Sequence, residues 1–299
     1  RQNFSEIGKK VNLSKNSVAL RFEKLKEYSL HNMVGINYEL INLSFVNVYY
    51  SFDYYDERTE TEIVEEVKKL KNVQRAAKYF GEYDLSLGFL VNNFDDLAMQ
   101  IDHFDERFAG RINKKQIIIN LKQYNYRYNF LHSNPITFVS KIEKSNKKVN
   151  LSNTDRKLLR FFILNPRINI IELAEKTGIT QKTASKRIKM LEKSGVIMGY
   201  FLTLDPKKFG YDTYKIFVRL YKLKKSKEFE EYVSRLKNIK YFGKTLGSWD
   251  YEVDLIYPNM NCLQKEIDEM KAKLPGMIKS IDISSLGRRI YTNEKNLFI

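Results

Sequence analysis

Residues 151–202 read LSNTDRKLLRFFILNPRINIIELAEKTGITQKTASKRIKMLEKSGVIMGYFL, and this stretch decides the fold of the chain. Its first part predicts a helix, because apolar residues recur three and four positions apart after Asn153 or Thr154, either of which can cap it. Pro166 ends that helix, and a second helix is expected over residues 170–176.

The connection from the second helix to the next one is short. Gly178 can close the second helix in the left-handed conformation, and Thr180 can cap a third helix that runs to about Ser194. This order matches a helix-turn-helix, whose last helix enters the major groove of DNA. The apolar residues between 195 and 202 predict a short wing after it.

The third helix has two unlike faces. Ala184, Ile188 and Leu191 form an apolar stripe, and lysines and a serine occupy the opposite face, where bases and phosphates would lie. Residues near the helix start can reach base edges. A merely solvated lysine face is the alternative, and the helix-turn-helix context makes it the weaker one. The candidate DNA-binding residues of this segment are Arg167, Thr180, Gln181, Lys182, Thr183, Ser185, Lys186, Lys189 and Lys193.

The chain contains one unit twice, with a shift of 166 residues. Gly81 corresponds to Gly247 and Asp84 to Asp250, and the alignment needs no net insertion. The first copy begins at the position equivalent to Arg167, so we expect its first helix to be missing from this sequence.

Each copy continues with alternating strand and helix patterns. Over residues 214–286 the order is strand, helix, strand, strand, helix, strand, which is the ferredoxin-like βαββαβ unit. Apolar residues on both faces of its first strand indicate that a second sheet covers the open face, so two such domains should pair. The expected class is α+β, with a winged helix-turn-helix and a ferredoxin-like domain, the pair present twice. The predicted domains are a partial winged helix-turn-helix at 1–38, a ferredoxin-like domain at 39–131, a basic linker at 132–150, a second winged helix-turn-helix at 151–203 and a second ferredoxin-like domain at 204–299.

The composition is that of a globular protein with a polyanionic partner. The 299 residues are 43% hydrophobic, and 52 Lys and Arg against 36 Asp and Glu give a net charge of +16, which favours nucleic acid or an anionic membrane surface. No apolar run approaches the ~18 residues that span a bilayer, so we expect a cytoplasmic, nucleoid-associated protein without a membrane partner. A lone cysteine, Cys262, and three scattered histidines predict no disulfide, no metal site and no cofactor.

Several motifs resemble those of one family. The runs Leu191-Glu192-Lys193-Ser194-Gly195-Val196-Ile197, Gly247-Ser248-Trp249-Asp250-Tyr251 and Leu274-Pro275-Gly276-Met277-Ile278 are similar to parts of the leucine-responsive and asparagine regulators, the Lrp/AsnC family of bacteria and archaea. The resemblance implies a transcription regulator that binds double-stranded DNA, forms homo-oligomers through its ferredoxin-like effector domains and, in many members, binds an amino acid or related small molecule. Two units in one chain would make each chain a pseudo-dimer.

The resemblance also implies effector-site candidates at two equivalent turns. They are Gly247, Ser248 and Asp250, with Gly81, Glu82 and Asp84. A structural role is the alternative, since a Gly can supply the positive φ of a turn that the Asp caps.

The two copies differ on their third helix. Lys182, Ser185, Lys186, Lys189 and Lys193 correspond to Asn16, Ala19, Leu20, Glu23 and Glu27, which takes the exposed face from +4 to −2. DNA affinity depends largely on phosphate neutralisation, so we expect the second helix-turn-helix to dominate binding. The first should be weakened, retargeted or used against protein. Its own candidates for DNA contact are Lys15, Asn16 and Ser17.

An enzyme is the alternative of a different class. Some relatives with this domain pair are siroheme decarboxylases, which act on a tetrapyrrole with histidine and other polar residues. Here the three histidines all lie before residue 150, and no phosphate loop or nucleophile elbow is present, so no catalytic residue is predicted. A protein-interaction scaffold with vestigial DNA-binding modules is a third interpretation.

Overall fold

The computed structural model describes residues 2–28, 31–126, 128, 131, 140–221 and 226–292. They form two compact units, and each unit takes one stretch from each copy. The helical unit comprises Arg1–Asn37 and Leu151–Tyr211, and the sheet unit comprises Tyr38–Asn150 and Asp212–Ile299. The sequence predicts a succession of domains along the chain, whereas these units are built from paired copies.

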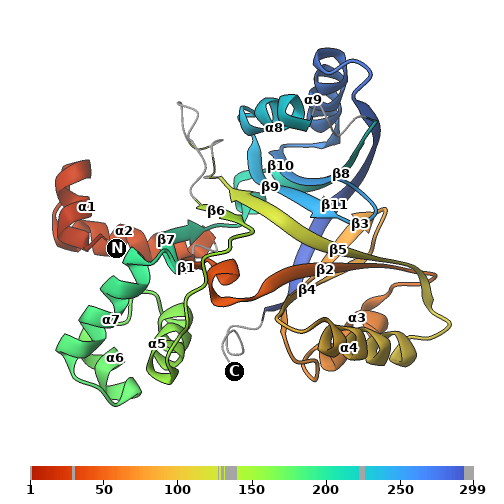
Figure 1. The fold of residues 1–299 in the computed structure, drawn as a ribbon. Coiled ribbons are helices and arrows are strands. Elements are labelled where there is room, and N and C mark those ends of the chain that lie inside the picture. The colour runs from red at the N-terminus through yellow and green to blue at the C-terminus, as the bar shows by residue number, and fades with distance from the viewer. Residues whose placement is uncertain are drawn as a thin grey trace. The chain divides into compact units, whose positions relative to one another are not determined.

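The second-copy helix-turn-helix consists of α5 (Asn153–Leu164), α6 (Ile170–Thr177) and α7 (Gln181–Lys193) (Figure 1). The cap of α5 is Ser152 and not the predicted Asn153 or Thr154, because Ser152 forms a reciprocal capping box with Asp155. Gly178 ends α6 with a φ of 71°, and Thr180 caps α7, both as predicted.

The first copy supplies α1 (Phe4–Val11), α2 (Lys15–Leu25) and the 3-10 helix η1 (Lys26–Tyr28) to the same unit. Its β1 (His31–Ile36) pairs antiparallel with β7 (Ile197–Thr203). The wing predicted for residues 195–202 is therefore a single strand whose partner comes from the other copy. Such a pairing leaves no signal in the local sequence. The short helix η4 (Pro206–Phe209) follows β7.

Both halves of the sheet unit have the predicted βαββαβ order. After the short helix η2 (Tyr38–Ile41), the first half consists of β2 (Ser44–Phe52), α3 (Glu57–Val67), β3 (Val73–Gly81), β4 (Leu85–Val91), α4 (Phe94–Arg107) and β5 (Ile112–Asn125). The second half consists of β8 (Asp212–Leu220), α8 (Ser226–Ser234), β9 (Ile239–Leu246), β10 (Tyr251–Tyr257), α9 (Met260–Lys273) and β11 (Ile278–Thr292). The α+β fold class with a duplicated domain pair is confirmed.

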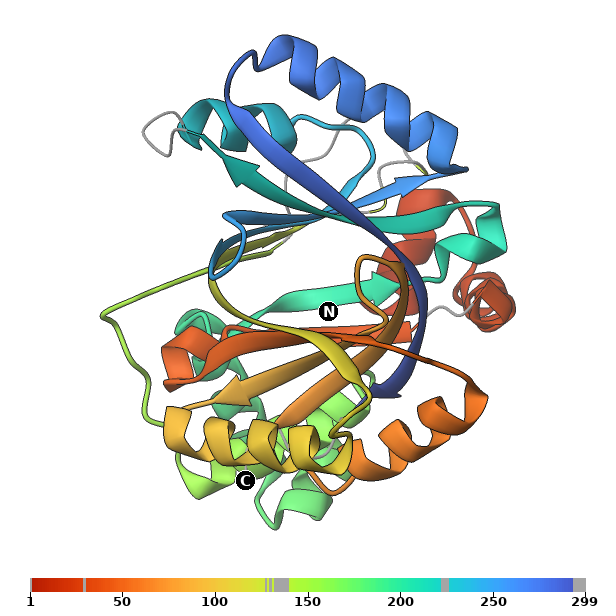
Figure 2. The ribbon, with the colours of Figure 1, turned by 90° about the vertical axis from the view of Figure 1, so that its right-hand side faces the viewer.

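The two halves share one sheet. Its strand order is β2-β4-β3-β11-β8-β10-β9-β5-β6, and a further pairing of β2 with β5 closes all strands except β6 into a ring. Within the sheet unit, α3 and α4 cover one outer side of this ring and α8 and α9 cover the opposite side (Figures 1 and 2). The strand β6 (Ser140–Glu143) lies in the segment predicted to be a linker and pairs with β5.

The halves are joined by an exchange of their last strands. The first part of β5 pairs with β2 of its own half, and its later part pairs with β9 of the other half. In the same way, β11 pairs first with β8 and then with β3. The pair Ile119 and Leu246 and the pair Ser285 and Phe80 occupy equivalent positions in the two copies, so the exchange is symmetric. The second sheet expected to cover the open face thus comes from the same chain.

Alternation along the strands builds three apolar clusters. In each half, one face of the strands packs against that half's two helices. Between the halves lies a third cluster, in which four aromatic residues pack with one isoleucine: Tyr49, Tyr83, Phe217, Trp249 and Ile118. In the described ranges, no helix has the length and apolar character needed to cross a membrane.

Candidate nucleic-acid interface

The orientation of α7 is set by its cap and its buried face. The Thr180 hydroxyl accepts a hydrogen bond from the backbone N–H of Thr183 at 3.2 Å, and the two hydroxyls lie 2.9 Å apart. Ala184 and Leu191 are 0% and 4% exposed, so the opposite side of the helix faces outward.

Four lysines follow that outward side at helical spacing: Lys182, Lys186, Lys189 and Lys193, here called the lysine stripe. All four are exposed, as is Gln181, while Thr183 and Ser185 are partly exposed. Ion pairs in the described part of this helix-turn-helix join Lys176 to Glu172 and Arg187 to Asp155, and the lysine stripe takes part in neither. Its charges are therefore available to a polyanion.

One arginine of α7 supports the helix from behind. Arg187 Nη1 donates to Ser152 Oγ at 2.9 Å and to Asp155 Oδ1 at 3.0 Å, which ties α7 to the start of α5. Burial acts to raise the pKa of the Asp155 carboxyl, but hydrogen bonds from Ser152 and Arg187 outweigh it and lower that pKa. This positioning role of Arg187 is not predictable from the sequence, because the contact joins residues 32 apart in the chain.

Arg167 packs against two aromatic rings of the other copy. Its guanidinium carbon is 4.6 Å from the ring centre of Phe4 and 4.6 Å from that of Phe22, and the residue is only partly exposed. A guanidinium between two rings gains cation–π attraction and packing. The structure thus places the Arg167 guanidinium at a contact between the two copies.

The equivalent helix of the first copy is α2. Lys15 and Asn16 are exposed at its start, while the Ser17 hydroxyl lies 2.9 Å from that of its cap, Ser14. Leu20, at the position of Lys186, is 61% exposed. The outward face of α2 therefore lacks the positive charges that α7 carries there.

The two Gly-x-x-Asp turns have strong structural roles. Asp84 Oδ2 accepts a hydrogen bond from the Phe52 backbone N–H at 2.8 Å, and Asp250 Oδ2 accepts one from Leu220 at 2.8 Å. Gly247 has a φ of 148°, and a Cβ there would lie 2.6 Å from Ile118 Cδ1.

The first-copy turn repeats this arrangement. Gly81 has a φ of 126°, and a Cβ there would lie 2.6 Å from the carbonyl oxygen of Ile283. For these Gly and Asp residues the structural alternative therefore accounts for the sequence pattern. The other two effector candidates also contact neighbours, Glu82 through an ion pair with Lys114 and Ser248 through a hydrogen bond to Gln116.

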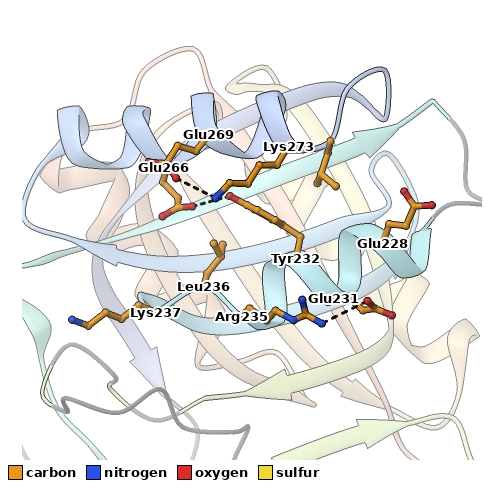
Figure 3. A pocket seen from close by; sticks show the side chains of 10 residues that line it. Glu228, Glu231, Tyr232, Arg235, Leu236, Lys237, Glu266, Glu269 and Lys273 are labelled. Carbon is orange, nitrogen blue, oxygen red and sulfur yellow. Dashed lines mark hydrogen bonds and ion pairs between the residues drawn. The ribbon is translucent and has the colours of Figure 1, made fainter.

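A groove of about 580 Å³ lies between α8 and α9 (Figure 3). Arg235 pairs with Glu231 at 3.9 Å and Lys273 with Glu269 at 3.5 Å. The hydroxyl of Tyr232 donates to Glu266 at 3.1 Å. In this groove the charged side chains of Arg235 and Lys273 are thus paired with acids of their own helices.

Comparison with known proteins agrees with the geometry of α5 to α7. A profile of winged helix-turn-helix DNA-binding domains matches residues 151–198. The leucine-responsive regulatory protein of Haemophilus influenzae is 30% identical over 142 residues, which cover 46% of this chain and 85% of that protein. An uncharacterized HTH-type transcriptional regulator of Pyrococcus furiosus is 32% identical over 100 residues, which cover 33% of this chain and 68% of the relative.

The likeness to solved structures extends over nearly the whole chain. The siroheme decarboxylase NirDL superposes with a TM-score of 0.64, covering 97% of this chain and 86% of that one, at 10% sequence identity. At this identity the likeness shows the fold alone. It extends over both copies, so the duplicated arrangement has a counterpart of known structure.

Proposed function

This chain belongs to the Lrp/AsnC family of helix-turn-helix transcription regulators, and from that premise we propose that it binds double-stranded DNA chiefly through α7. The observation that supports the dominance of α7 is the lysine stripe, four exposed lysines that share one side of the helix. Four charges on one face neutralise phosphates, while Gln181 and Thr183 at the helix start reach base edges.

The first copy supplies the natural comparison. At the positions of the stripe it carries Asn16, Leu20, Glu23 and Glu27, so the phosphate attraction of that face is lost. The repulsion between this face and DNA phosphates is reduced at Glu23, because Glu23 forms an ion pair with Lys26 at 2.6 Å. On this basis α7 supplies most of the affinity of the chain for DNA.

An exchange of faces tests the proposal. The variant Lys182→Asn, Lys186→Leu, Lys189→Glu and Lys193→Glu gives α7 the first-copy face and should abolish retention of labelled genomic DNA fragments. The opposite variant, Asn16→Lys, Leu20→Lys, Glu23→Lys and Glu27→Lys, should strengthen retention. All eight positions lie on exposed faces, and circular dichroism checks that both variants fold. Unchanged retention in the first variant would refute the dominance of α7.

We further propose that one chain is the counterpart of a regulator dimer. The exchange of β5 and β11 completes inside one chain the pairing of sheets that two chains would otherwise make. Larger homo-oligomers then form from whole chains, and light scattering after size exclusion measures their mass. A protein that is monomeric at all concentrations would contradict the assembly of whole chains into homo-oligomers.

The effector is proposed at the same Gly-x-x-Asp turns. Ser248 and Glu82 present side chains there that a small amphoteric molecule can engage by competing with Gln116 and Lys114. Thermal shift with a panel of amino acids tests this, with Ser248→Ala and Glu82→Gln as variants. A ligand whose effect is unchanged in both variants binds elsewhere.

We propose no enzymatic role. A shared fold does not imply shared chemistry. Among the residues whose side chains the structure describes, His103 lies on α4 with its side chain 57% exposed and paired with Glu66, outside the sheet ring. Binding of a tetrapyrrole, seen as an absorbance band of the purified protein, would favour the decarboxylase alternative.

A further inference from the structure

The two helix-turn-helix segments are related by a pseudo-twofold axis. In the β1–β7 ladder Val34 pairs with Tyr200, and these are equivalent residues, 166 apart. An antiparallel pair in which a residue faces its own equivalent has a twofold axis through that point. A bulge at Gly35 and Ile36 is the one irregularity of the ladder. The helical unit thus contains both members of a dimeric reader.

The helices α2 and α7 begin in the same way. Ser14 caps α2 and accepts from Ser17 N–H at 3.1 Å, as Thr180 caps α7 and accepts from Thr183 N–H at 3.2 Å. The hydroxyls of each pair lie 2.9 Å apart. Both helices are therefore built to present their first turns alike, and only their outward side chains differ.

The outward side chains of α2 are suited to A·T base pairs. Asn16 is exposed in the first turn, and the amide of an asparagine matches the N6 and N7 edge of adenine. One turn later Leu20 is 61% exposed, and apolar side chains contact the methyl group of thymine. The lysines at the equivalent positions of α7 are instead suited to the O6 and N7 acceptors of guanine.

Phosphate contacts can still hold α2 in place. Lys15, Arg21 and Lys24 are exposed on its flanks, and Lys9 and Lys10 are exposed in the last turn of α1. Leu20 is exposed beside Glu23, whose charge is paired with Lys26, and the other cations lie on the flanks of the helix. This arrangement fits a groove floor between phosphates better than an apolar protein surface. Since α7 already anchors the chain, the second contact is intramolecular and needs little affinity of its own.

We propose that α2 reads a second half-site of A·T base pairs, so that a single chain recognises an asymmetric operator. This rests on the proposed function, because it requires α7 to hold the first half-site. The half-sites should differ in sequence and lie about 10 bp apart, or a multiple of that spacing.

Selection from random duplex DNA tests this inference, followed by footprinting of the enriched sequence. We expect two unlike half-sites, one of them A·T. In that half, Asn16→Ala should reduce the preference for the selected bases about 5- to 150-fold, and Leu20→Ala should also reduce it, with the other half unchanged. Lys182→Ala is the reciprocal control and should affect only the other half.

The outcomes separate the two proposals. A palindromic operator, a single half-site, or selection unchanged by both α2 variants would overturn the asymmetric operator and leave the role of α7 standing. Failure to retain any duplex would overturn the proposed function itself.

Discussion

Removal of the lysine stripe should change the salt dependence of DNA binding as well as its strength. Each phosphate contact contributes about 0.9 to the slope of log K against log salt, so alanine at Lys182, Lys186, Lys189 and Lys193 should reduce the slope by about 3.6. Between about 50 and 200 mM salt, the affinity of the variant would then change about 150-fold less than that of the original chain. Fluorescence anisotropy with a labelled duplex measures both slopes.

A matched control separates contact from net charge. Lys227, Lys265, Lys271 and Lys279 are exposed lysines of the sheet unit, and their replacement by alanine removes the same four charges. This control should keep the original slope to within about one unit. If the two variants lose equal slope, the attraction is a property of the whole charged chain, and the placement of the lysines on α7 would be irrelevant.

Three further predictions concern the framework that holds these surfaces. Asp155→Asn should destabilise the helical unit at neutral pH. Because the pKa of Asp155 is lowered in the folded state, its carboxylate contributes stability that is present above about pH 4 and is lost as the pH falls through the folded-state pKa, so the variant should lose less stability in acid than the original chain. The helical circular dichroism signal measured against pH tests this, and the same acid profile in both proteins would refute it. Gly247→Ala should cost more stability in urea than Gly276→Ala. Gly247 combines a φ of 148° with a close approach to Ile118, whereas Gly276 has a φ of 66° and open space around its Cβ. The control should cost roughly 1 kcal/mol, and equal costs would show that neither the close contact nor the more extreme φ matters. Lys215→Met should lower the free energy of unfolding in urea by about 3–5 kcal/mol, because it leaves Glu252 buried without its cation. Adding Glu252→Gln should recover part of that loss. A double variant no more stable than the single one would contradict the pairing.

The elements of this fold were predictable because their signals are local. Apolar spacing and caps place α5 to α7, and period-two alternation places the strands of both halves. The closed ring was not predictable, since it depends on pairing β5 with β9 and β11 with β3, across the two copies. Either half could satisfy its own pattern with a partner from another chain, and sequence alone does not distinguish these cases.

The candidate site also combines features that were predictable from the sequence with features that were not. The lysine stripe follows from helical spacing and is found on one exposed face. The roles of Arg167 and Arg187 do not follow, because the first depends on two rings of the other copy and the second on Ser152 and Asp155. Charge in a sequence shows what can attract DNA, and only the fold shows which charges are already in use.

The interior of the sheet ring also differs between the copies. Lys215, Glu252 and Asp254 of the second half form buried or partly buried ion pairs, and their equivalents in the first half are Tyr49, Ser86 and Gly88. A donor from the first half completes this cluster, as Asn47 Nδ2 lies 3.4 Å from Glu252 Oε2.

This difference bears on which halves pair. Two second halves facing each other would bring two carboxylate clusters together. Two first halves would leave Asn47 without its acceptor. The buried polar groups therefore favour the unlike pair, in which a first half packs against a second half. Once the unlike pair is enforced in the sheets, the two helix-turn-helix segments are always unlike as well. Each recognition helix is then free to diverge, which the contrast between Leu20 and Lys186 exemplifies.

On this reasoning, exchanging Lys215, Glu252 and Asp254 for their first-half counterparts should weaken the preference for the unlike pair. Separately expressed halves should then also self-associate, and native mass spectrometry would show the mixed complex losing its dominance.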